Sequence, residues 1–165
     1  MSDERRVVSD TGPLISLEKL PDGHRLIRTL YDSVLVPPAV LDELAHGLFE
    51  SPDAYLDHYG IRSLVDVVAP PAEAPGVERL DRGERDAISL ALDRGLPLLI
   101  EEEAGRTVSR QLGIPISGIA GQVLKARRRR LLTRADAERM LLVLFESGRI
   151  NRRVYDGVGE AIRSS

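Results

Sequence analysis

Short apolar runs recur along the chain, and most are followed by a segment in which apolar residues return every three or four positions. The runs are rich in Val, Leu and Ile and end at Pro, Gly or a charged residue, which is typical of buried strands. Their length is too small for helices of ordinary size. The pattern predicts strands at Val7–Ser9, Val34–Val36, Leu64–Val68, Leu96–Ile100 and Ile114–Ser117.

Helical spacing fills most of the remaining sequence. The stretch 47–60 has a weak pattern and is expected to be irregular or loosely helical, while the Pro-rich stretch 70–76 predicts a loop. Strands that alternate with helices predict an α/β fold with one parallel sheet of five strands covered by helices on both faces, in a single domain spanning 1–165. The predicted helices include one that starts with Leu14–Leu17 and is opened by Pro13, then His24–Leu30, Ala39–Leu44, Asp81–Arg94, Glu103–Leu112, Ile119–Arg130, Thr133–Glu146 with Thr133 as its cap, and Arg152–Arg163.

Composition narrows the class of protein. The chain has no cysteine, which excludes a disulfide scaffold, a thiolate metal site and a cysteine nucleophile. No apolar stretch approaches the roughly 20 residues that span a bilayer, and the first residues are charged where a secretory signal would be apolar. We therefore expect a cytoplasmic protein without a membrane partner.

Charge gives a local signal. The formal net charge is −3, yet Lys125–Arg130 is a concentrated basic run and Arg149, Arg152 and Arg153 form a second group. Basic side chains near a helix C-terminus also offset the helix dipole, so a solvated helix end is the alternative interpretation of the run. The chain has six aromatic residues and no Trp, so stacking of bases on aromatic side chains is not expected to be a main way in which it binds nucleic acid.

Acidic residues follow several of the predicted strands. Asp10 comes directly after the first strand and before Thr11-Gly12-Pro13, where a helix is about to begin. Carboxyl ends of parallel strands meet at one edge of a sheet, so acids placed there are expected to converge and to repel one another unless a cation binds them. Acids in a first helical turn also favour the helix dipole, which is the alternative for each one alone. The other acids at such positions are Glu43 with Asp42, Glu84 with Asp86, and Glu101–Glu103.

Four blocks of sequence carry these acids in order: Val7–Ile15, Val36–Leu44, Gly83–Ala91 and Leu99–Arg106. In order and spacing they resemble the PIN-domain superfamily, and most closely its DUF3368 branch, which is related to VapC-type toxins. Smaller pieces agree, namely Leu112–Ile114 before Ser117-Gly118, and Val123–Ala126. The resemblance covers most of the chain and implies a PIN-like fold.

The resemblance implies a ribonuclease whose acids hold one or two Mg²⁺ or Mn²⁺ ions, which are also the cations that an oxygen-only ligand set favours. Asp10 matches the first acid of the family, Glu43 the second and Asp86 the third, with Glu84 in its Gly-Glu pair. The fourth acid is usually Asp and falls on Glu101. A Glu side chain is one methylene longer, so Glu102 in a shifted register is the other candidate.

These matches lead to a functional hypothesis, the hydrolysis of phosphodiester bonds in single-stranded RNA by a metal-activated water. The resemblance also implies a homodimer and a cognate antitoxin protein. Thr11 is expected to contact a coordinated water or a phosphate, or to cap its helix, and Arg106 to orient a carboxylate or contact a phosphate. The residues expected to attract RNA are Lys125, Arg127, Arg128, Arg129 and Arg130.

Two alternatives remain. A PIN-like module that has lost cleavage through the change at Glu101 would bind RNA or a partner protein without cutting. A phosphoryl-transfer protein with an aspartyl nucleophile would need a second Asp two residues after Asp10, where the sequence has Gly12.

Overall fold

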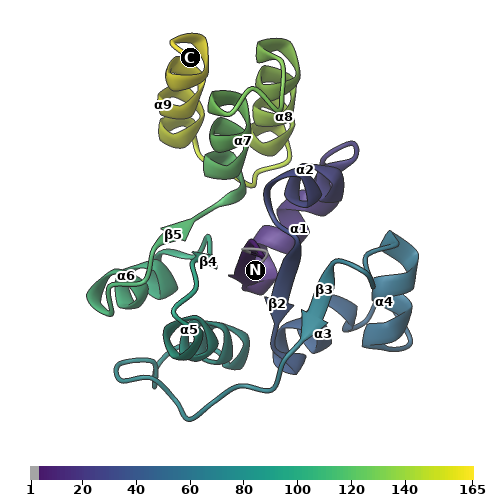
Figure 1. Ribbon diagram of the computed structural model, residues 1–165, viewed down its shortest axis with the longest axis vertical. Coiled ribbons are helices and arrows are strands. Elements are labelled where there is room, and N and C mark those ends of the chain that lie inside the picture. The colour runs from purple at the N-terminus through teal and green to yellow at the C-terminus, as the bar shows by residue number, and fades with distance from the viewer. Residues whose placement is uncertain (1–3) are drawn as a thin grey trace.

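A parallel sheet of five strands forms the centre of the computed structural model, which describes residues 4–165 (Figure 1). The strands are β1 (Arg6–Ser9), β2 (Ser33–Val36), β3 (Val65–Val67), β4 (Leu98–Leu99) and β5 (Ile116–Ser117), in the order β3-β2-β1-β4-β5. Successive residues of β1 and β2 are all buried or nearly so, although they point to opposite faces. Helices therefore cover both faces, and the predicted α/β architecture is confirmed.

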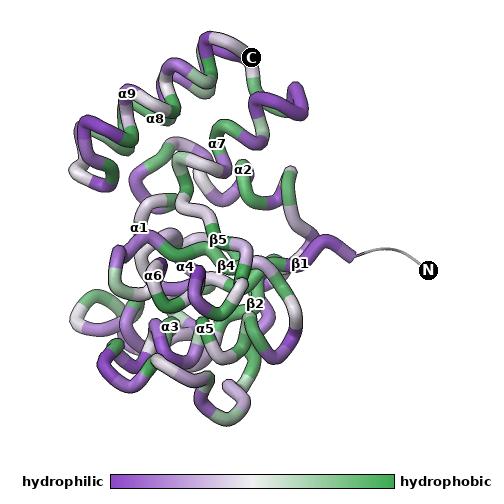
Figure 2. Tube along the Cα trace, turned by 90° about the vertical axis from the view of Figure 1, so that its left-hand side faces the viewer, coloured by the Kyte–Doolittle hydropathy of each residue, from purple (hydrophilic) through white to green (hydrophobic). Residues whose placement is uncertain are grey.

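Nine helices are present in the part of the chain that the structure describes, and they leave the apolar strands in the interior (Figure 2). The last three pack against one another and form a helical unit beyond the end of β5 (Figure 1). The helices are α1 (Thr11–Lys19), α2 (Gly23–Leu30), α3 (Pro38–Ala45), α4 (Pro52–Tyr59), α5 (Arg82–Arg94), α6 (Glu103–Gln111), α7 (Ile119–Arg128), α8 (Arg134–Glu146) and α9 (Arg152–Arg163).

The structure differs from the sequence expectation mainly in the stretch 47–60. This stretch contains a regular helix, α4, which is capped by the Ser51 side chain and begins with Pro52. Its buried face is formed by Tyr55 and Leu56, and Tyr55 packs edge-on against Phe49. Aromatic residues that carry a polar atom give a weak hydropathy signal, which explains why the helix was not clear from the pattern.

Caps and strand ends follow local chemistry. Thr133 accepts a hydrogen bond from the Asp136 backbone N–H at the start of α8, which confirms the predicted cap. Strands β4 and β5 are shorter than predicted and begin after Pro97 and Pro115, which have no N–H to donate to a neighbouring strand.

The direction of chain progression across the sheet reverses between β1 and β4. From β1 the chain moves outward to β2 and β3, and then returns to place β4 and β5 on the other side of β1. Connections that leave neighbouring strands in opposite directions open a crevice at the carboxyl ends of these strands, where α/β proteins bind ligands. Asp10 directly follows β1 at this point, and its N–H donates to the Leu99 carbonyl of β4. None of the helices formed by the described residues is long and apolar enough to cross a membrane.

Candidate metal centre

Asp10 is a buried carboxylate at the crevice. The residue is 3 % exposed, and its Oδ1 atom is buried without a hydrogen-bond partner. Asp10 precedes the first residue of α1, but its side chain makes no capping hydrogen bond. Burial raises the pKa of Asp10 from 3.8 to about 7, and the negative charges of Asp81, Glu43 and Glu102 add to this increase.

Glu43, on α3, is a second carboxylate near Asp10, and two hydrogen-bond donors fix its orientation. The Thr11 hydroxyl donates to Glu43 Oε2 at 2.5 Å, and the Gly83 N–H donates to Oε1 at 3.2 Å. Thr11 therefore does not cap α1, as one interpretation of the sequence had it, but fixes the carboxylate of a neighbouring helix. This contact joins the segment after β1 to the helix after β2.

Glu84 and Asp81 lie together at the start of α5. Asp81 caps the helix and accepts a hydrogen bond from the Glu84 N–H at 2.8 Å. The Glu84 residue is 5 % exposed, and its Oε2 atom is buried without a partner. Burial, a side-chain hydrogen bond with Asp81 and the charges of Asp81, Asp10 and Glu102 raise the pKa of Glu84 to about 8. Sequence reasoning missed Asp81, although an Asp three residues before Glu84 has the spacing of a helix cap.

Asp86, the expected third acid, lies in a different environment. It is two positions after Glu84, so the two side chains point about 200° apart around the helix axis. The charges that act on it come from Arg82, Arg85 and Glu73, and the Arg82 guanidinium approaches its carboxylate to 3.9 Å. The structure thus brings Glu84 to Asp10, but does not bring Asp86 there.

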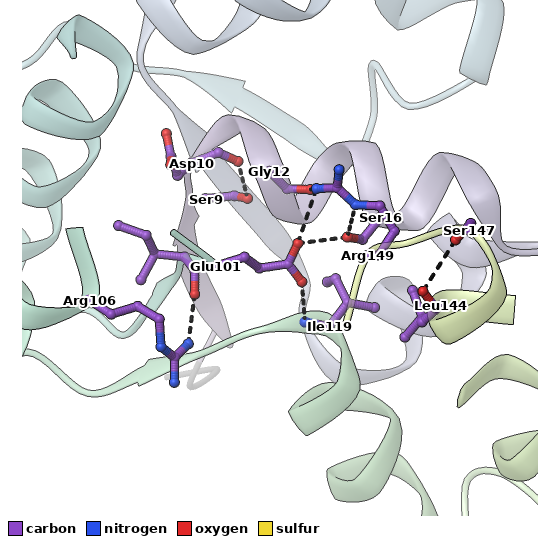
Figure 3. A network of polar contacts seen from close by, with 11 residues as sticks. Ser9, Asp10, Gly12, Ser16, Glu101, Arg106, Ile119, Leu144, Ser147 and Arg149 are labelled. Atoms are coloured by element: carbon purple, nitrogen blue, oxygen red, sulfur yellow. Dashed lines mark hydrogen bonds and ion pairs between the residues drawn. The ribbon is translucent and has the colours of Figure 1, made fainter. Parts of the chain in front are cut away.

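Glu101 and Glu102 divide the expected role of the fourth acid. Glu102 is exposed, precedes the first residue of α6 and acts electrostatically on both Asp10 and Glu84. The Glu101 carboxylate instead accepts hydrogen bonds from Ser16, at 2.6 Å, and from the Ile119 N–H, at 3.0 Å. It also pairs with Arg149 at 3.4 Å, and Figure 3 shows this carboxylate turned toward Ser16 and Arg149 rather than toward Asp10. Of the two residues, Glu102 is therefore the one whose charge acts on Asp10 and Glu84.

Comparison with known families decides the classification. The model of DUF3368, described as a PIN domain, matches residues 6–163. The chain belongs to this PIN-domain family. A solved structure of a PilT N-terminus domain protein, SSO1118 from the hyperthermophilic archaeon Sulfolobus solfataricus P2, has the same fold with a TM-score of 0.52. It shares 19 % sequence identity, and the match covers 71 % of this chain and 88 % of that one. No functionally curated protein matches the sequence.

Two glycines of this PIN domain allow its acids to come close. A Cβ atom at Gly83 would lie 2.6 Å from Glu43 Oε1, and one at Gly105 would lie 2.5 Å from both Glu84 Oε2 and Ile100 Cδ1. Both distances are well below a van der Waals contact, so any side chain at these positions would displace a carboxylate. The Gly-Glu pair at 83–84 and the glycine before Arg106 thus have a steric explanation.

The donor set of the PIN domain fits a hard divalent cation in charge and chemistry. Within residues 4–165, no three acidic or histidine side chains already stand where they could hold one ion together. Two buried carboxylate oxygens, on Asp10 and Glu84, nevertheless have no partner, and the neighbouring ionisable groups that affect them are acidic. Carboxylate oxygens are the ligands that Mg²⁺ and Mn²⁺ prefer. We call Asp10, Glu43, Asp81, Glu84 and Glu102 the acidic cluster.

The residues expected to bind substrate have mostly intramolecular partners. Arg106 donates to the Ile100 carbonyl at 2.8 Å and so braces the end of β4 (Figure 3). Lys125 donates to the Tyr31 hydroxyl at 3.1 Å and lies over its ring, while Arg127 donates to the Leu132 carbonyl.

Arg128, Arg129 and Arg130 are exposed at the far end of α7. This helix begins beside Glu101, and its ten residues make it about 15 Å long. These three arginines therefore lie roughly a helix length away from Glu101.

Proposed function

We propose that this PIN domain is a metal-dependent endoribonuclease, similar to VapC toxins, that hydrolyses phosphodiester bonds of single-stranded RNA with Mg²⁺ or Mn²⁺. A PIN domain is a nuclease-type fold. The observation that carries the proposal is the acidic cluster, in which buried carboxylates without partners converge at the crevice between β1 and β4. Such an arrangement costs stability and is typical of functional sites.

Asp10 and Glu84, with Glu43 and Glu102, would hold the ion. When bound, a divalent cation lowers the pKa of a water molecule and stabilises negative charge on the leaving oxygen. The protein's own contribution is orientation. Thr11 and the Gly83 N–H hold the Glu43 carboxylate, and Asp81 fixes the first turn from which Glu84 projects.

Protonation gives the acidic cluster a second property. With pKa values near 7 and 8, Asp10 and Glu84 retain protons at neutral pH when no cation is present. A bound cation favours the ionised forms, so metal binding would release protons. Cleavage is therefore expected to increase from pH 6 to pH 8 at subsaturating metal concentration.

The test uses a mixed-sequence single-stranded RNA with Mg²⁺, Mn²⁺ or EDTA. The wild type is expected to cut only with metal, and Asp10→Asn to lower the rate by on the order of 10³-fold or more with an unchanged circular dichroism spectrum. Equal cleavage by wild type and Asp10→Asn would contradict the proposal. RNA binding by the wild type without any cleavage would instead support the non-cutting module.

Two quaternary assignments, a homodimer and a cognate antitoxin that covers the site, follow only from the family resemblance and remain predictions. The cytoplasmic location follows from composition and also remains a prediction. Size-exclusion chromatography with light scattering tests the dimer, and co-purification from the native host tests the antitoxin.

A further inference from the structure

A groove with a volume of about 740 Å³ lies between α6 and α9, on the side of the sheet edge that holds Glu101. Strand β5 and the first turn of α7 also line it. Glu101 lines its inner end, and the Arg149 guanidinium there donates to the Gly12 carbonyl at 3.0 Å. The inner end is joined to the acidic cluster through the backbone, because Gly12 is two residues from Asp10 and Glu101 is adjacent to Glu102.

Four arginines give the groove a positive charge. Arg106 and Arg110 come from α6, while Arg149 and Arg153 come from the turn before α9 and from its first turn. Two acids, Glu101 and Glu103, also line the groove, so its formal charge is positive in a chain whose net charge is −3. A positive surface next to an acidic cluster offsets the repulsion between the cluster and a polyanion.

The arginines divide into two kinds by their contacts. At the inner end, Arg106 is held by the Ile100 carbonyl, and Arg149 is held by Ser16, Gly12 and Glu101. At the outer rim, Arg110 is half exposed and makes one ion pair, with Glu103 at 3.2 Å. Arg153 is exposed and makes no side-chain hydrogen bond or ion pair within residues 4–165. The two rim arginines face solvent from opposite walls, so both are available to an incoming anion.

The lining of the groove favours contact with a backbone rather than with bases. No aromatic residue is among the described residues that line the groove, and the segment of β5 and α7 that lines it contributes mainly small residues, Ser117, Gly118, Ala120 and Gly121. Sequence-tolerant stacking of bases requires aromatic side chains, whereas arginines bind phosphates.

We propose that this groove is the path of the RNA strand, and that Arg110 and Arg153 bind backbone phosphates on either side of it as the strand enters the acidic cluster. The inference rests on the proposed function for the identity of the strand. It replaces the basic run Lys125–Arg130, whose exposed arginines at 128–130 lie roughly a helix length from Glu101.

The experiment measures binding of a fluorescein-labelled 12-nucleotide oligouridylate to the wild-type protein in EDTA, where metal-dependent cleavage cannot interfere. Arg110→Gln combined with Arg153→Gln removes two phosphate contacts. The dissociation constant is expected to rise roughly 10- to 30-fold at 0.1 M salt. The negative slope of the log association constant against log salt concentration is expected to become shallower by about 1.4. A matched control, Arg94→Gln with Arg134→Gln, removes two exposed arginines outside the groove and is expected to change affinity less than about 2-fold.

A further arm, Arg128→Gln with Arg130→Gln, tests the basic run directly. Loss of affinity in this variant without loss in the groove variant would overturn the inference, as would a wild type that does not bind the oligonucleotide. A polyglutamate peptide that displaces the RNA with equal affinity would assign the groove to an acidic protein segment and would also overturn it.

Different results would refute the proposed function and the groove assignment. A wild type that never cuts RNA, but whose binding depends on Arg110 and Arg153, refutes the proposed function and leaves the groove assignment standing. A wild type that cuts, with a groove variant that binds as the wild type does, refutes the groove assignment alone.

Discussion

Glu101 and Glu102 are neighbours in sequence, follow the same strand and carry the same side chain, yet they belong to two different regions. The Glu101 carboxylate lies in a neutralised network, where it receives hydrogen bonds from Ser16 and the Ile119 N–H and pairs with Arg149. Glu102 belongs to the acidic cluster, where its negative charge contributes to the raised pKa values of Asp10 and Glu84.

The difference lies in how each region compensates buried charge. In the Glu101 network, donors from α1, α7 and the turn after α8 converge on one carboxylate, so the contact joins the helical unit to the sheet. In the acidic cluster, Asp10 and Glu84 are buried with oxygens that lack any donor. A compensated carboxylate stabilises the fold, whereas an uncompensated cluster lowers stability and calls for a cation from outside the chain.

Glu84 and Asp86 should give the sharpest contrast in activity. Glu84→Gln is expected to lower metal-dependent RNA cleavage by on the order of 10³-fold, because it removes a charge from the acidic cluster. Asp86→Asn, a matched control on the same helix, is expected to stay within about 3-fold of the wild type. Comparable losses of cleavage rate in both variants, measured under single-turnover conditions, would show that Asp86 also belongs to the site and that the acidic cluster is wrongly assigned.

The pH dependence of stability should separate the acidic cluster from the rest of the molecule. The pKa of Asp10 is about 7 in the folded protein against an ordinary value of 3.8, so the folded state retains a proton that the unfolded state loses. The free energy of unfolding therefore falls as pH rises through this window.

Without metal, Asp10→Asn is accordingly expected to gain roughly 2–3 kcal/mol relative to the wild type between pH 5 and pH 8. Urea unfolding of both proteins at the two pH values measures this difference. If the difference in the free energy of unfolding between the two proteins were the same at both pH values, the pKa of Asp10 would not be raised in the folded state.

Glu101→Gln should instead affect folding. It removes the charge opposite Arg149, and both side chains are mostly buried, so a loss of about 2 kcal/mol in the free energy of unfolding is expected. Metal affinity measured by titration should change little. A variant with wild-type stability and no metal binding would place Glu101 in the metal site.

Gly83→Ala tests the close approach of Glu43 with the smallest change. The added Cβ would lie 2.6 Å from Glu43 Oε1 and should displace this carboxylate, weakening Mn²⁺ binding about 10-fold. The control Gly157→Ala adds a Cβ in open space within α9 and should leave Mn²⁺ affinity unchanged. Equal affinity in both variants would show that Glu43 is not needed for the ion.

Much of the fold could be predicted from sequence because β-branched and Leu-rich strands between helices leave a strong pattern. The position of Asp10 at the end of β1 also follows from that pattern. Helix α4 was not clear because Tyr and His give a weak hydropathy signal, and Asp81 was missed because it was part of a helix start rather than of a strand end.

The remaining differences between expectation and structure concern side-chain direction. Sequence places Glu84 and Asp86, or Glu101 and Glu102, within one or two positions of each other, and only the rotation of the helix or strand decides which one faces the crevice. The same limit applies to Lys125 and Arg127, whose partners Tyr31 and Leu132 become visible only in the folded chain.

Calorimetric titration with Mn²⁺ at pH 7.5 tests the central claim, that the acidic cluster rather than the Glu101 network binds a divalent cation. The wild type and Glu101→Gln are expected to bind Mn²⁺ with similar affinity and with release of protons, while Asp10→Asn and Glu84→Gln show no saturable binding. Saturable binding that survives Asp10→Asn and disappears in a folded Glu101→Gln protein would contradict the account.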